Sequence, residues 1–313
     1  DGERGVPTVL QFLEKEMPAK STLAFDGRIL TEKFVNKLYE RLYGLDVSFA
    51  DNFDAGEFVW ENRPPLPANK VFELPEKFCG KSRTEKIADI RAKMSAEKAD
   101  YIALSALDEI AWTLNLRGGD VDFCPLFLSF MIISHSKVFL FADKTKFSEE
   151  IARNLQSDNV EILPYDEIYN ALKRLNGAVW TDKSAVNHAF VSSLENARVI
   201  DKTLPISLMK AVKNEAEIAA EKRAHIKDGV AVTRFRKWLC KAVLQGNITE
   251  ISAAEKLEEF RKMGENYLGQ SFAPIMAYGE HGAIVHYSAD SATNALLEPR
   301  GLLLSDTGGH YLD

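Results

Sequence analysis

One carboxylate in the sequence follows directly on an apolar run. In "GLLLSDTGG", Asp306 comes after Leu302–Leu304 and a serine. A carboxylate at the end of a buried strand is costly unless a cation or several hydrogen-bond donors meet it, so Asp306 is a candidate metal ligand. The alternative is an Asx-turn, in which the Asp306 side chain accepts from the backbone as the chain enters Gly308 and Gly309. The motif alone leaves both open.

A histidine occupies a comparable place twenty residues earlier. In "GEHGAIVHYS", His286 ends a β-branched apolar run that follows a glycine-rich turn. A histidine at the end of a buried strand can donate to a substrate carbonyl or stabilise charge on a developing oxyanion. A histidine with a purely structural role in a core or loop is the alternative.

An arginine beside two glycines is the third candidate. "LDEIAWTLNLRGGDV" places Arg117 next to Gly118 and Gly119. The glycine pair permits close backbone approach, and an arginine there could bind a carboxylate through two parallel hydrogen bonds. The alternative is an arginine that caps helix carbonyls or pairs with Asp120.

The elements that must position these residues change character along the chain. Helical and strand patterns alternate over residues 6–60 and, after the proline-rich stretch around "WENRPPLP", again over 83–197. This alternation predicts partly parallel sheets covered by helices, an α/β class. From residue 203, two amphipathic helical stretches precede strand-like segments that contain His286 and Asp306, an order typical of α+β. We therefore predict domains over 1–78, 79–202 and 203–313.

Composition excludes several classes of partner. The chain has 313 residues, of which 46% are hydrophobic and 27% charged, and its net charge is −7, so nothing indicates nucleic acid or an anionic membrane as partner. Its longest apolar run, around residues 124–133, is far shorter than the roughly 20 residues that span a bilayer. The three cysteines lack CxxC spacing, which suits reduced thiols and a cytoplasmic location.

The quoted motifs and their spacing together resemble one family. "WENRPPLP", "LDEIAWTLNLRGGDV", "GAIVHY" and "LLLSDTGGHYLD" are similar to Xaa-Pro aminopeptidase (aminopeptidase P), the large cytosolic three-domain type of the creatinase/pita-bread metallopeptidases. The resemblance implies a remnant of a first creatinase-type α/β domain over 1–78, a second over 79–202, and the first part of a pita-bread catalytic domain over 203–313. It further implies a homodimer with two Mn²⁺ ions that removes the N-terminal residue from peptides with proline in second position.

The same resemblance implies roles for the candidate residues. Asp306 matches the first carboxylate ligand of the dinuclear metal site, and His286 matches a catalytic, substrate-contacting histidine near the scissile bond. Arg117 matches the arginine of an "NLRG" motif and is a candidate substrate-binding residue, whereas Asp313 matches an acidic residue that is not a ligand. The remaining ligands would lie beyond residue 313. We therefore expect an internal fragment of a longer protein, without bound metal and inactive on its own.

Two other functions are compatible with the same fold. One is a catalytically inactive pita-bread protein that binds a partner, and the other is a metal-free, creatinase-like amidinohydrolase. The second metal-binding Asp and the later His and Glu ligands would separate these functions from a peptidase.

The first prediction concerns metal binding by the chain as written. It should bind Mn²⁺ only weakly and hydrolyse no Xaa-Pro peptide, because a hard divalent cation takes about six oxygen or nitrogen ligands and Asp306 is the sole family ligand present. Calorimetric titration with Mn²⁺ and an assay on an Arg-Pro-Pro type peptide measure both properties. Micromolar Mn²⁺ binding together with turnover would contradict the prediction.

Overall fold

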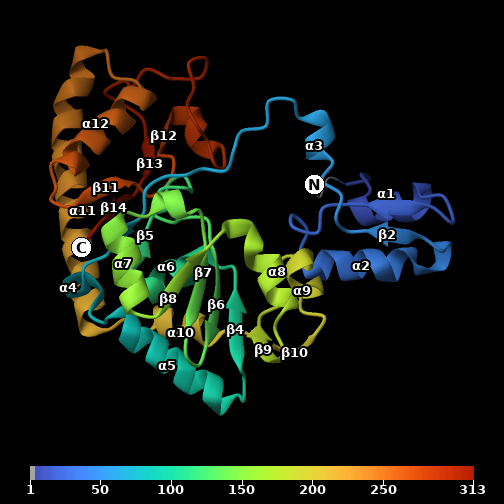
Figure 1. Ribbon diagram of the computed structural model, residues 1–313. Helices are drawn as coiled ribbons and strands as arrows, with labels where there is room; N and C mark the ends of the chain where they lie inside the picture. The colour runs from blue at the N-terminus through green and yellow to red at the C-terminus, as the bar shows by residue number, and fades with distance from the viewer. Residues whose placement is uncertain (1–3) are drawn as a thin grey trace. The chain divides into compact units, whose positions relative to one another are not determined.

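The structure is a computed structural model that describes residues 4–313 (Figure 1). The chain forms two compact units. Unit 1 contains the chain up to Phe72 together with Arg83–Leu116 and Phe127–Ala211, and unit 2 contains Glu73–Ser82, Arg117–Leu126 and Val212–Asp313. The three domain boundaries predicted from the sequence stay predictions.

The first part of unit 1 is a small parallel βα arrangement. Strands β1 (Thr22–Ala24) and β2 (Ser48–Ala50) pair in parallel, and α2 (Glu32–Leu42) connects them. Thr31 caps α2, because its side chain accepts from the N–H of Phe34. The remaining elements are α1 (Val9–Glu16), η1 (Tyr43–Leu45) and α3 (Gly56–Val59).

A six-stranded mixed sheet forms the centre of unit 1. Its strand order is β10-β9-β4-β6-β7-β8, and β6 pairs antiparallel with β4 and with β7, while all other pairs are parallel. Buried Ile132, Phe141, Val179 and Phe190 contribute to its core. The strands are β4 (Tyr101–Leu104), β6 (Phe130–Ser134), β7 (Val138–Phe141), β8 (Val160–Leu163), β9 (Gly177–Thr181) and β10 (Ala197–Asp201).

Helices flank this sheet, as the α/β pattern predicts. In unit 1, α6 packs against α5 and α10. The helices are α5 (Arg83–Ala96), α6 (Leu107–Leu114), α7 (Glu149–Ser157), α8 (Ile168–Lys173), α9 (His188–Ser192) and α10 (Pro205–Ala211), with the short 3-10 helices η2 (Lys144–Lys146) and η3 (Tyr165–Glu167). Three short elements lie near the points where the chain passes from one unit to the other. They are β3 (Phe72–Glu73), α4 (Glu76–Cys79) and β5 (Leu116–Arg117), and β3 pairs with β5.

Unit 2 follows the predicted order of helices and then antiparallel strands. The 28-residue helix α11 (Glu215–Ala242) begins with a capping box at Asn214, and α12 (Glu250–Lys262) begins with one at Thr249. The two helices and β12 enclose a core that includes Phe235, Leu257 and Met276. The other elements are η4 (Val243–Gln245), β11 (Tyr267–Gln270), β12 (Ile275–Tyr278), η5 (Gly279–Ala283), β13 (Leu303–Asp306) and β14 (Gly309–Tyr311); β12 pairs with β13 and β11 with β14.

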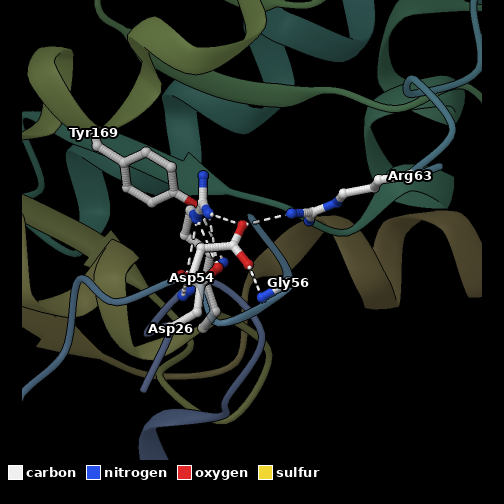
Figure 2. A network of polar contacts seen from close by, with 7 residues as sticks. Asp26, Asp54, Gly56, Arg63 and Tyr169 are labelled. Atoms are coloured by element: carbon white, nitrogen blue, oxygen red, sulfur yellow. Dashed lines mark hydrogen bonds and ion pairs between the residues drawn. The ribbon is translucent and has the colours of Figure 1, made fainter. Parts of the chain in front are cut away.

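A polar network joins the loops that follow β1 and β2 (Figure 2). The Arg28 side chain donates to both carboxylate oxygens of Asp26 over 2.7–3.0 Å and to Asp54 over 2.9 Å. Arg63 donates to the same Asp54 oxygen over 2.7 Å. Burial raises the pKa of Asp26, but hydrogen bonds from Arg28 and its charge outweigh burial and hold the pKa below its ordinary value of 3.8. The network therefore fixes both loops through charge-assisted hydrogen bonds.

The second prediction follows from this network. Asp26→Asn should lower the free energy of unfolding by about 1–2 kcal/mol at neutral pH, since Arg28 loses its charged acceptor but is itself half-exposed. A carboxylate with a depressed folded-state pKa stabilises fully above its unfolded pKa and loses that contribution as pH falls through the folded value.

The difference between wild type and variant should therefore shrink as the buffer goes from about pH 5 to about pH 2. Denaturant unfolding of both chains across this range measures it. Asp46→Asn is the matched control, because Asp46 is exposed and has a left-handed backbone that asparagine also adopts. A difference that stays constant with pH would contradict the assignment.

Candidate functional site

Asp306 is the last residue of β13, opposite Ile275 of β12. Its side chain is exposed, as are Leu302 and Leu304 before it. The expectation of a buried strand is therefore wrong for β13 in the described part of the chain, where β12 is its only paired strand. An exposed carboxylate at a strand end keeps its oxygen atoms available to a ligand.

A partly buried ion pair fixes the turn that follows Asp306. The Arg261 side chain, only 2% exposed, donates from Nε to Asp228 Oδ1 over 2.7 Å and from Nη2 to Asp228 Oδ2 over 3.1 Å. The same Nη2 donates to Thr307 Oγ1 over 3.0 Å, and the Tyr311 hydroxyl donates to Asp228 over 3.3 Å. A two-point arginine–carboxylate pair between α11 and α12 thus determines the position of the residue next to Asp306.

Gly308 of the turn lies in close approach to a neighbouring segment. A Cβ on Gly308 would lie 2.1 Å from Ser271 Oγ, well inside the van der Waals limit. The Ser271 N–H in turn donates to the Gly308 carbonyl over 3.1 Å. The Gly308 backbone therefore packs directly on the segment that follows β11.

Asp313 is bound to α11. Lys227 Nζ donates to its two carboxylate oxygens over 2.5 and 2.7 Å, and the Asp313 side chain is 7% exposed. Burial raises the pKa of Asp313, but the hydrogen bond and charge of Lys227 lower it by more, so the net pKa lies below its ordinary value. The Asp313 carboxylate is thus paired with the Lys227 ammonium group, whereas the Asp306 carboxylate is exposed.

The loop that contains His286 is not the strand that the sequence predicts. Gly279–Ala283 forms the 3-10 helix η5, and His286 lies beyond it with φ 56°, in the left-handed region. Its side chain is exposed, whereas that of Tyr287 is buried. Contacts to a distant carboxylate override the strand preference of Ile284 and Val285.

That carboxylate belongs to Glu250, the first residue of α12, which is fully buried. Its Oε1 accepts from the Tyr278 N–H over 2.7 Å and from His281 Nδ1 over 2.9 Å. Its Oε2 accepts from the Tyr287 hydroxyl over 2.7 Å and from the Ala295 N–H over 3.0 Å. Burial raises the pKa of Glu250, but these four donors lower it more, so the net pKa lies below the ordinary value of 4.5.

Arg117 is a half-buried residue of β5 in unit 2. Burial lowers its pKa, while the nearby ionisable groups of Cys79 and Glu217 act in the opposite direction. The loop after Arg117 closes through a hydrogen bond from the Gly118 N–H to the Pro125 carbonyl over 3.1 Å. Arg117 therefore lies in an environment formed by α4, α11 and its own loop.

The structure places two of the three predicted residues next to one pair of strands, with Asp306 on β13 and His286 in the loop between β12 and β13. Strand β12 leads into η5 and pairs with β13, so the loop of His286 and the strand of Asp306 are neighbours in unit 2. Arg117 lies on β5, which pairs with β3. Residues 4–313 contain no group of three or more His, Cys, Asp or Glu that could hold a metal ion.

Sequence reasoning missed the residues that fix this site, namely Lys227, Asp228, Glu250 and Arg261. Each is a charged residue in an amphipathic helix, where charged side chains usually face solvent. The one available signal was the first-turn position of Glu250, where a helix N-terminus favours a carboxylate.

Known proteins share both parts of this architecture. Residues 62–217 match the Creatinase/Prolidase N-terminal domain, and residues 219–313 match metallopeptidase family M24. The chain is therefore similar to a creatinase-type N-terminal domain over residues 62–217 and to metallopeptidase family M24 over residues 219–313, and the fold class predicted from the sequence is confirmed.

Within this class, the chain is similar to Xaa-Pro aminopeptidases. It is 34% identical to Xaa-Pro aminopeptidase 1 of Dictyostelium discoideum, covering 99% of this chain and 51% of that protein. It is 32% identical to Xaa-Pro aminopeptidase ApepP of Drosophila melanogaster, covering 100% of this chain and 52% of that protein. The chain thus spans about half the length of the curated relatives it matches, and the predicted family resemblance is confirmed.

Solved structures agree with this assignment. The X-prolyl aminopeptidase of Caenorhabditis elegans, described as a cytosolic enzyme with a di-nuclear active site, superposes with a TM-score of 0.90 at 28% identity, over 100% of this chain and 53% of that chain. The Xaa-Pro dipeptidase of Bacillus anthracis, at 18% identity and a TM-score of 0.55 over 74% of this chain and 62% of that chain, shares the fold. Among the residues described, none of the helices is both long enough and apolar enough to cross a membrane.

The third prediction concerns the ion pair beside Asp306. Arg261→Ala should lower the free energy of unfolding by about 2–4 kcal/mol, because it leaves the Asp228 carboxylate without its two-point partner and Thr307 without its donor. Denaturant unfolding measures the loss. Arg234→Ala, at an exposed position of α11, is the control and should change stability by less than about 0.5 kcal/mol. Equal effects of the two substitutions would remove Arg261 from the support of the turn.

Proposed function

We propose that this chain functions within an Xaa-Pro aminopeptidase that hydrolyses the N-terminal residue from peptides with proline in second position. The observation that carries the proposal is the TM-score of 0.90 to the Caenorhabditis elegans X-prolyl aminopeptidase over the whole chain. The sequence relatives, at 32–34% identity over nearly all of the chain, support the same activity.

Asp306 is the proposed metal ligand in this chain. Its carboxylate is exposed at a strand end, whereas that of Asp313 is bound to Lys227, so Asp306 fits the donor chemistry of a hard cation and Asp313 does not. One carboxylate alone does not complete such a site. Two metal ions bound there would supply a hydroxide nucleophile at neutral pH and would polarise the scissile carbonyl. Carboxylate and imidazole ligands suit Mn²⁺, which we propose as the metal.

His286 is the proposed catalytic residue of this chain. Its exposed imidazole can donate a hydrogen bond to the oxygen that gains charge as the peptide carbonyl is attacked. Arg117 is proposed as a substrate-binding residue on its half-buried position beside two glycines; a structural role near Glu217 is the competing assignment.

Assembly and location extend the same proposal. A homodimer and a cytoplasmic location are proposed from the resemblance to the three-domain aminopeptidases. The free thiols of Cys79, Cys124 and Cys240 suit a reducing compartment, and the Caenorhabditis elegans relative is described as cytosolic.

The fourth prediction tests His286 in the full-length enzyme. His286→Ala should lower kcat on an Xaa-Pro peptide by about 100-fold through loss of transition-state stabilisation, with metal content unchanged. Steady-state kinetics and metal analysis of the purified variant provide the measurement. His225→Ala, at an exposed position of α11, is the control and should retain wild-type kcat. Wild-type turnover by His286→Ala would remove His286 from the reaction.

A further inference from the structure

The four donors to Glu250 fall on both sides of His286 in the sequence. Glu250 Oε1 accepts hydrogen bonds from Tyr278 and His281, which precede His286. Its Oε2 accepts hydrogen bonds from Tyr287 and Ala295, which follow His286. A single buried carboxylate therefore ties together both ends of the segment that presents the imidazole.

The backbone of His286 needs such support. A non-glycine residue with φ 56° is in a sparsely populated region, and it persists only where its surroundings fix it. The preceding Val285 is 83% exposed, so packing of that side chain does not supply the constraint. The following Tyr287 is buried, stacks on His281 with ring centroids 4.5 Å apart, and donates its hydroxyl to Glu250.

The support depends on an acceptor with two equivalent oxygen atoms. Each oxygen of Glu250 faces one backbone N–H, which cannot become an acceptor, from Tyr278 on one side and Ala295 on the other. A glutamine in the same place would direct its NH₂ group at one of these two N–H donors whichever way it is turned. Only a carboxylate satisfies both sides at once.

We infer that Glu250 is a positioning residue for the proposed peptidase site, which acts on His286 through Tyr287 and His281. The backbone that presents the imidazole at the surface is thereby held in one conformation before a substrate arrives. The kinetic consequence rests on the proposed function, whereas the constraint on the loop is a property of this chain alone.

The kinetic experiment uses the full-length enzyme with Glu250→Gln and the milder Tyr287→Phe, which removes only the hydroxyl. Each should lower kcat at least tenfold, with KM and metal content within about twofold of wild type. Combined with His286→Ala, each should cause no further loss of kcat, because residues that act through one group are not additive. Glu255→Gln, at an exposed position of the same helix, is the matched control and should keep wild-type kcat.

A second experiment measures the constraint without activity. Amide hydrogen exchange in the present chain should be at least tenfold faster over residues 279–288 in Tyr287→Phe and Glu250→Gln than in wild type, with α11 unchanged. Glu255→Gln should exchange as wild type does throughout.

The outcomes separate the inference from the proposed function. Inactive wild-type enzyme on Xaa-Pro peptides would overturn the proposed function, and the exchange result would still decide whether Glu250 constrains the loop. Unchanged exchange over 279–288, or additive losses of kcat in the double variants, would overturn the positioning role. If Glu250→Gln does not fold, Tyr287→Phe carries both tests.

Discussion

A buried negative charge at the start of α12 sets the conformation of the surrounding loop. The Glu250 carboxylate is removed from water, and such a charge is tolerated only when its lone pairs are met by donors. The donors come from the end of β12, from η5 and from the residues before β13, so satisfying one side chain determines the path of the chain between two paired strands. The left-handed backbone of His286 follows from this constraint and not from its own preference.

The same physical rule recurs at the other end of β13. Asp228 and Arg261 satisfy each other and extend one further hydrogen bond to Thr307, while Lys227 neutralises Asp313. His286 and Asp306, the groups proposed to act on substrate and metal, are exposed, whereas the groups that fix them are buried or paired. This division suits a site that must be held in place before its ligand arrives.

The sequence predicted those features that depend on local interactions. Helices and strands alternate over residues 83–197 as the apolar patterns predict, and from residue 203 the helices precede antiparallel strands. It failed at Ile284 and Val285, whose β-branched side chains favour a strand, because Glu250, more than thirty residues earlier, imposes a different path.

Contacts between residues this far apart along the chain leave no periodic pattern in a single sequence. The residues of the candidate site divide in the same way, into those marked by local sequence and those that only the fold brings together. His286 and Asp306 could be selected because glycine-rich turns and apolar runs mark them locally. Lys227, Asp228 and Arg261 look like ordinary solvent-facing charges of amphipathic helices until the fold pairs them. The family resemblance supplied roles for the marked residues and none for their supports.

Helix α11 also sets the distance between two attachment points within unit 2. Asn214 at its start donates to the Cys79 carbonyl over 2.8 Å, and Lys227 and Asp228 hold the last residues of the chain. At 1.5 Å per residue, these two attachment points lie about 20 Å apart along a rigid rod. Each added residue would turn the far end by about 100° as well as lengthening the rod, so the spacing and the angle between the two attachments are fixed together by the number of residues between them.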